Sequence, residues 1–121
     1  MMRQWMVDPR VLCRKHLLGE HVEHHMLLGT LRKKKSIQGY LDSNLSQPST
    51  IYSRHRQLTL EMVSRGYNHR SPIHRAEADF HTEYLSEEQY HHTIDRAPAL
   101  KDLLSRCPDC RRRYDKLNEE E

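Results

Sequence analysis

Apolar side chains recur at steps of three, four and seven residues over the first third of the chain, which is typical of a helix. Asp8 suits the N-cap of such a helix, and Pro9 suits its first position. The spacing therefore predicts one helix from about Pro9 to about Lys34. The periodic apolar residues are Val11, Leu12, Leu18, Val22, Met26, Leu27 and Leu31.

The rest of the chain favours shorter helices over strands. Only four glycines and five prolines occur in 121 residues, and clusters of β-branched residues are missing. Ser86 and Gln89 have the spacing of a capping box, which opens a helix. We expect a loop over 36–50, a helix from Ile51 to about Arg65, a loop over 67–82, a helix from Ser86 to about Ile94, and a helical segment over 98–118 that is interrupted at Cys107-Pro108.

These elements predict an all-α fold. With 36% hydrophobic residues in 121, the chain can bury one modest core. We therefore expect a compact single helical domain over residues 1–121, with one long N-terminal helix and two to three shorter helices.

Charge and hydropathy limit the class of protein. Twenty Lys and Arg face 17 Asp and Glu, which permits binding to nucleic acid without requiring it. The mean hydropathy is −0.96, and no apolar run approaches the roughly 20 residues of a membrane span. The chain opens without a basic and apolar leader, and three cysteines are too few for a disulfide scaffold. These features favour an intracellular, cytoplasmic protein without membrane contact.

A polar face of the long helix is the first candidate site. His16, Glu20 and Glu23 are spaced i, i+4 and i+7, and Cys13 extends the same face. The face could be solvated and carry no function. In a cleft that shifts a pKa, its carboxylates and imidazole could perform acid–base catalysis.

The amino-terminal segment Met1-Met2-Arg3-Gln4-Trp5 is the second candidate. An α-amine has a pKa near 7.7–8.0, so much of it is an unprotonated nucleophile at neutral pH. Such an amine can attack the anomeric carbon of a sugar and form a Schiff base. Alternatively, the segment only anchors Trp5 in the core, and the two roles can coexist.

Three motifs resemble the pyrimidine-dimer DNA glycosylase family, whose founding member is the phage enzyme called endonuclease V. The resemblance covers residues 2 to about 73, and a phage or bacterial source would agree with it. The motifs are Met2-Arg3-x-Trp5, His16-Leu17-x-x-Glu20-x-x-Glu23 and Leu58-x-x-Glu61-x-x-x-Arg65-Gly66-Tyr67-Asn68.

The resemblance implies an all-α fold with the amino terminus packed against the long helix. Met2 would supply the α-amine nucleophile, and Glu23 would be the catalytic carboxylate. Arg3 and His16 would hold the DNA, and we group Glu20, on the same face, with them. The chain departs from the family in that Met1 precedes Met2, and that the family has arginines where Val22 and Met26 stand. The family's aromatic and basic C-terminal segment is not recognisable either.

Basic residues close the long helix. Arg32 and Lys33 begin a run of four cations that could contact phosphates, and Arg54 on the second helix could extend this patch. The alternative is that the run only complements the helix dipole.

Two groups of residues could bind metal. Cys107 and Cys110 form a CxxC half site, which needs two more ligands, such as His81, His91 or His92, or a second chain, to hold a structural zinc ion. Without them it is a pair of reduced thiols. His21 and His25, at i and i+4, could bind a metal on the helix face opposite the catalytic one, but the pattern is not HExxH.

The residues and the resemblance together predict a DNA repair glycosylase with AP-lyase activity. It would excise a damaged or modified pyrimidine from double-stranded DNA through an imine, without a cofactor apart from a possible structural zinc ion. The alternatives are a metal-dependent nuclease and a non-catalytic nucleic-acid-binding module stapled by zinc.

Overall fold

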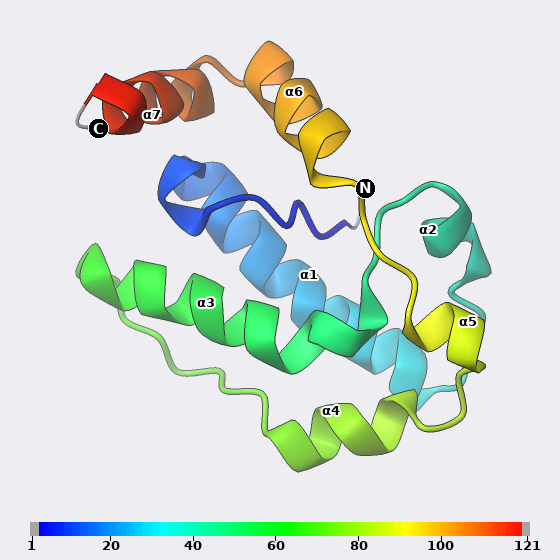
Figure 1. The fold of residues 1–121 in the computed structure, drawn as a ribbon. Coiled ribbons are helices and arrows are strands. Elements are labelled where there is room, and N and C mark those ends of the chain that lie inside the picture. Colours follow the sequence, from blue (N-terminus) through cyan, green and yellow to red (C-terminus); the bar gives the residue numbers. More distant parts are fainter. Residues whose placement is uncertain (1–2, 120–121) are drawn as a thin grey trace.

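The computed structural model describes residues 3–119, and all regular elements in that range are helical (Figure 1). The all-α prediction is therefore confirmed, although the described residues form more helices than expected. The α-helices are α1 (Arg14–Arg32), α2 (Gln38–Asp42), α3 (Ile51–Ser64), α4 (Arg75–Thr82), α5 (Glu87–Tyr90), α6 (Arg96–Arg106) and α7 (Pro108–Glu119), and two 3-10 turns are η1 (Pro9–Val11) and η2 (Pro48–Thr50).

The long helix begins later than predicted. Asp8 does act as an N-cap, because its Oδ1 accepts a hydrogen bond from the Arg10 amide at 3.0 Å, but it caps only η1. Leu12 then adopts an extended backbone, and α1 starts at Arg14 behind Cys13. Both Leu12 and Cys13 at this break are buried in the core.

Two predicted loops contain helices. The 36–50 segment holds α2 and η2, and the 67–82 segment ends in α4. α4 buries only Ala78 and Thr82, which is too sparse a pattern to signal a helix in the sequence. The capping box that opens α5 is present as predicted, with Ser86 and Gln89 bonded reciprocally. α6 starts before Pro98, because Asp95 caps it.

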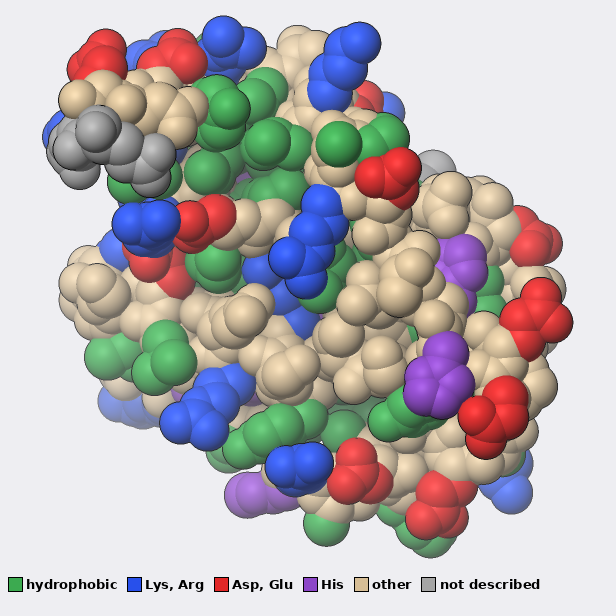
Figure 2. Space-filling view, in the orientation of Figure 1, with side chains coloured by type: hydrophobic (Ala, Val, Ile, Leu, Met, Phe, Trp, Pro, Cys, Tyr) green, Lys and Arg blue, Asp and Glu red, His purple; other side chains and the backbone are tan. Residues whose placement is uncertain are grey.

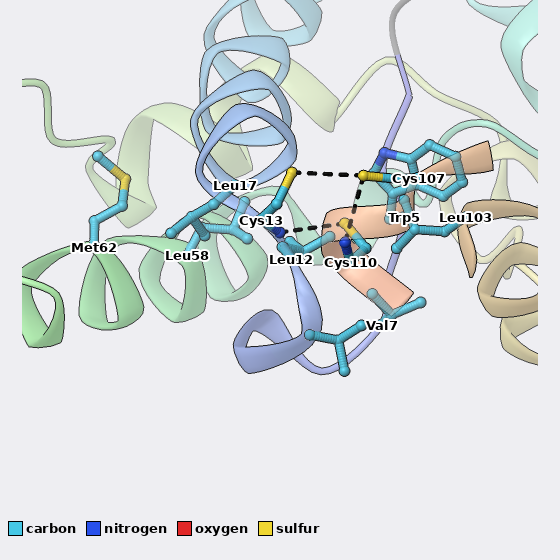
Figure 3. Close-up of a cluster of buried hydrophobic side chains, with 11 residues drawn as sticks. Trp5, Val7, Leu12, Cys13, Leu17, Leu58, Met62, Leu103, Cys107 and Cys110 are labelled. Carbon is cyan, nitrogen blue, oxygen red and sulfur yellow. Dashed lines mark hydrogen bonds between the residues drawn. The ribbon is translucent and has the colours of Figure 1, made fainter. Parts of the chain in front are cut away.

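α1 is central to the packing. In Figure 1 it runs between α3 and the amino-terminal segment, while α6 and α7 lie over its first turns. One hydrophobic cluster surrounds the start of α1 and joins Trp5 and Leu17 to Leu58 and Leu103 (Figure 3). A second cluster surrounds its end and involves α2, α3 and α4.

The buried face of α1 differs from the predicted apolar stripe. Val22 and Met26 were expected in that stripe, yet they are 53% and 55% exposed. Glu20, His21 and His24 are buried instead. Polar groups of the amino-terminal segment and of α3 lie opposite them, so tertiary partners replace apolar contacts in the middle of the helix.

Surface charge is mixed on the face drawn in Figure 2. Lys and Arg side chains alternate there with Asp and Glu, and apolar side chains gather over α6 and α7. Within residues 3–119, none of the helices combines the length and the apolar character that crossing a membrane requires.

Candidate active site

A pocket of about 390 Å³ lies where the amino-terminal segment crosses α1. The three residues predicted to share a helix face all reach it. Side chains from both ends of the chain line it, namely Arg3, Trp5, Lys15, His16, Glu20, Glu23, Leu45 and Arg106 together with Gly19.

The amino-terminal segment is tied to two carboxylates of α1. The amide of Arg3 donates to Glu23 Oε2 at 2.8 Å, and the amide of Trp5 donates to Glu20 Oε1 at 3.0 Å. Residues i and i+2 of an extended segment point the same way, and residues i and i+3 of a helix share a face. The spacing of Arg3 and Trp5 in the extended segment therefore matches the spacing of Glu23 and Glu20 on α1. The two hydrogen bonds align the start of the chain along the helix.

Glu20 belongs to the interior rather than to a DNA-binding surface. Its carboxylate pairs with the Arg54 guanidinium, with Nε to Oε2 at 2.5 Å and Nη2 to Oε1 at 3.0 Å. Arg54 also donates to the Val7 carbonyl at 2.7 Å. Glu20 is 1% exposed and Arg54 is 2% exposed. Both charges are therefore paired inside the fold, and the DNA contacts predicted for Glu20 and Arg54 remain predictions.

Glu23 has a different environment from Glu20. Among residues 3–119, no arginine makes a bidentate ion pair with Glu23. Burial raises the pKa of Glu23 to about 7, although the hydrogen bond from the Arg3 amide acts in the opposite direction. A carboxyl group that titrates near neutral pH can both accept and donate a proton. Such a shift in a pocket is characteristic of catalytic groups.

Arg3 is held between an aromatic ring and an acid. Its guanidinium carbon lies 3.9 Å from the centroid of the Trp5 ring, and Nη1 lies 3.9 Å from Asp102 Oδ2. Arg3 Nε is buried without a hydrogen-bond partner among the described residues. Trp5 itself is buried, so the anchoring role considered for this segment is present beside the pocket.

Lys15 and Arg106 are pocket residues that sequence reasoning missed. Lys15 stands next to His16, which was the available signal. Arg106 comes from the end of α6, far along the chain, where it pairs with Asp102 at 3.0 Å. No spacing in the sequence connects Arg106 to α1, so only the fold could reveal it.

The other predicted basic residues lie away from the pocket. Arg32 pairs with Glu77 of α4, and Lys33 follows the last residue of α1. Ten residues of helix separate Lys33 from Glu23, which corresponds to about 15 Å. A larger hollow, of about 540 Å³, between α2 and α5 has Asp42 and Glu88 but no Lys or Arg among its lining residues.

Histidines gather on the far face of α1. His21, His55 and His69 have ring nitrogens within 4.8 Å of one another, and His25 Nε2 lies 3.1 Å from His55 Nε2. Burial lowers the pKa of His21 to about 4 and that of His55 to about 3, so these imidazoles are neutral. The sequence suggested His21 and His25, whereas His55 and His69 join them only through the fold.

The histidines proposed to complete the CxxC half site do not do so. His91 pairs with Glu87, and His92 lies 3.0 Å from Asn44 Oδ1. Cys13 and His16 of α1 approach Cys107 and Cys110 instead. The predicted nucleophile, Met2, lies outside the described residues.

The fold and the site together define a class of protein. It is a small all-α protein in which a carboxyl group of near-neutral pKa lies beside the first residues of the chain. A family model described as pyrimidine dimer DNA glycosylase matches residues 2–75. The chain belongs to this family, as the motifs indicated, and the family acts on damaged DNA. Searches of curated proteins and of solved structures gave no match.

Proposed function

We propose that the protein is a DNA glycosylase with AP-lyase activity that removes a damaged or modified pyrimidine from double-stranded DNA. Membership of the glycosylase family supports the reaction class. The observation that carries the proposal is the 2.8 Å hydrogen bond from the Arg3 amide to Glu23. One residue of chain spans at most about 3.6 Å, so the α-amine that removal of Met1 would leave on residue 2 can reach the same carboxyl group.

In the proposed reaction the α-amine attacks C1′ of the damaged nucleotide. The N–C1′ bond forms as the bond from C1′ to the base breaks, and the base leaves with the electron pair and gains a proton. The sugar ring then opens to an imine, with the amine proton passing to O4′. Loss of a C2′ proton finally expels the 3′ phosphate, which cleaves the strand.

Glu23 is assigned two roles in this sequence of steps. As a carboxylate it stabilises positive charge that develops on the sugar, and such stabilisation is strongest in a site that excludes water. With a pKa of about 7 it can also accept the C2′ proton and release it again.

Cations at the pocket are proposed to hold the DNA backbone. Lys15 and Arg106 are exposed at the pocket, and Arg3 adds a third positive charge to its lining. His16 shares this pocket and is proposed to position the nucleotide beside Glu23. Arg32 and Lys33 are proposed as more distant phosphate contacts.

Borohydride trapping tests the proposal. The chain incubated with duplex DNA that carries a pyrimidine dimer and then reduced is expected to form a covalent adduct whose peptide map ends at residue 2. Glu23→Gln is expected to lower strand cleavage roughly 10²- to 10⁴-fold while DNA binding persists. Glu83→Gln, which changes an exposed acid that does not line the pocket, serves as the matched control.

The alternatives give other results in the same assay. A metal-dependent nuclease at the histidine cluster would lose cleavage in His69→Ala and form no adduct. A non-catalytic binding module would bind DNA without cleaving or trapping any lesion. Full activity of Glu23→Gln, or a mass showing that residue 2 does not carry the free amine of the active protein, would refute the assigned roles.

A further inference from the structure

Four metal-ligand side chains meet between the start of α1 and the start of α7. Cys13 and His16 come from α1, and Cys107 and Cys110 come from the junction of α6 and α7. Figure 3 shows the three sulfur atoms facing one another inside the first hydrophobic cluster. We propose that these four residues form a Cys3His zinc site that fastens the C-terminal helices to α1.

The distances between the ligand atoms match a tetrahedral zinc ion. With Zn–S of about 2.3 Å and Zn–N of about 2.0–2.1 Å, sulfurs lie about 3.8 Å apart and a sulfur and a nitrogen about 3.6 Å apart. Cys13 Sγ and Cys107 Sγ are 3.8 Å apart, and His16 Nδ1 lies 3.6 Å from Cys110 Sγ and 3.2 Å from Cys13 Sγ. All four ligand atoms are within 4.8 Å of one another.

The two halves of the site have the same local construction. Cys13 stands immediately before α1 and His16 follows three residues later, in the first turn. Cys107 stands immediately before α7 and Cys110 follows three residues later. Each half therefore directs two ligands from one helix start, and the positive ends of both helix dipoles favour thiolate ligands.

Backbone amides donate hydrogen bonds to two of the sulfur atoms. The Cys13 amide donates to Cys110 Sγ at 3.2 Å, and the Cys110 amide donates to Cys107 Sγ at 3.4 Å. All three cysteines are buried and none forms a disulfide. Three buried cysteines and one half-buried histidine supply the four sulfur and nitrogen ligands that a structural zinc ion takes in tetrahedral geometry.

The site would link two parts of the chain that the family match separates. Cys13 and His16 lie within the matched residues 2–75, whereas Cys107 and Cys110 lie beyond them. A metal ion on Nδ1 of His16 also leaves its Nε2 as an N–H donor, in a side chain that lines the Glu23 pocket. The zinc proposal does not depend on the glycosylase activity.

Metal content of the purified full chain tests the proposal. Protein prepared with reducing agent is expected to contain one zinc ion per chain, as measured by inductively coupled plasma mass spectrometry. The Cys107→Ser and Cys110→Ser variants are expected to lose this zinc. His69→Ala and His91→Ala are the controls, because both change a histidine outside the site, and they should retain the zinc. Zinc that disappears in His69→Ala and persists in the cysteine variants would overturn the assignment.

Cobalt substitution of the unmodified chain avoids reliance on variants that fail to fold. Zinc-depleted protein titrated with Co²⁺ is expected to show tetrahedral ligand-field bands and strong thiolate-to-metal charge-transfer absorption, both reversed by added Zn²⁺. His16→Ala should keep the charge-transfer absorption and change the ligand-field bands. Unaltered spectra on titration, or a Cys107–Cys110 disulfide in the native mass, would refute the site.

Discussion

The two faces of α1 bury titratable groups with opposite consequences. On the pocket face, burial raises the pKa of Glu23 to about 7. On the histidine face, burial lowers the pKa of His21 to about 4 and that of His55 to about 3. Desolvation disfavours the charged form in both cases, so acids and bases shift in opposite directions. On the pocket face this shift is combined with an opening lined by cations.

The difference teaches that burial alone does not define a catalytic group. Glu20 and Glu23 lie on the same face of α1, yet Glu20 is paired with Arg54, whereas Glu23 accepts a hydrogen bond from the Arg3 amide. His21 and His55 are neutral, and their rings contact each other and the rings of His69 and His25. Access, partner and burial together distinguish Glu23.

The largest predicted effect on stability comes from breaking the ion pair between Glu20 and Arg54. Arg54→Met leaves the Glu20 charge buried without its partner, which is expected to cost about 3–5 kcal/mol of unfolding free energy. Urea unfolding followed by circular dichroism measures it. Arg56→Met on the exposed side of α3 is the control, and adding Glu20→Gln to Arg54→Met should restore much of the loss. Equal effects of Arg54→Met and Arg56→Met would contradict the structural role.

The next prediction concerns the pH dependence of catalysis. If Glu23 must be ionised, the lyase rate should rise with pH through about 7, the pKa of its carboxyl group. Single-turnover rates between pH 5.5 and 8.5 measure this limb. The limb near pH 7 should be absent from the residual activity of Glu23→Gln, which keeps the rise near pH 7.7–8.0 that deprotonation of the α-amine gives, and it should be unchanged in His69→Ala. A limb near pH 7 that persists in Glu23→Gln would assign that titration to another group.

A smaller effect concerns how the folding stability depends on pH, because the two faces of α1 contribute with opposite sign. The pKa of Glu23 is higher in the folded chain than its ordinary value of 4.5, so its contribution is present below pH 4.5 and is lost as pH rises toward 7. The pKa values of His21 and His55 are below their ordinary value of 6.5, so their contribution is present above pH 6.5 and is lost as pH falls toward 4. Between pH 4.5 and 6.5 the slopes therefore oppose each other.

Variants resolve these opposing slopes. Glu23→Gln should make stability rise more steeply with pH in that window, whereas His55→Gln should make it rise less steeply. The midpoint of thermal unfolding at several pH values measures both. Parallel pH profiles for the wild type and the two variants would mean that neither face titrates as the structure indicates.

The smallest effect adds charge beside the pocket face. Val22 and Met26 are exposed on α1 at the positions where the family has arginines, so Val22→Arg with Met26→Arg should fold normally. Each new phosphate contact steepens the salt dependence of log K by about 0.9. Fluorescence anisotropy with duplex DNA over a range of salt concentrations measures this slope. Leu60→Arg with Val63→Arg on α3 is the matched control, and an equal gain there would indicate unspecific attraction.

The sequence predicted which polar residues share a face of α1 better than it predicted where the helices begin and end. His16, Glu20 and Glu23 were assigned to one helix face by spacing alone, and they do line one pocket. The start of α1 was misplaced because the Asp8-Pro9 signal serves a 3-10 turn. α4 was missed because two buried residues in eight give no period.

The roles of Glu20 and Arg54 could not be predicted from local pattern. Their spacing along the chain is 34 residues, and the pairing is decided by how α3 packs on α1. The same holds for the zinc proposal, since Cys13-x-x-His16 and Cys107-x-x-Cys110 are separate half sites until the helices bring them together.

The sequence by itself determined the helical class, the family and the line of polar residues along one helix, because periodicity and motif spacing are local properties of the chain. Tertiary structure alone decided which carboxylate is neutralised by an arginine, which histidines cluster and which thiols meet. Those outcomes depend on burial and on contacts between residues far apart in the chain, and the spacing of residues along the sequence predicts neither.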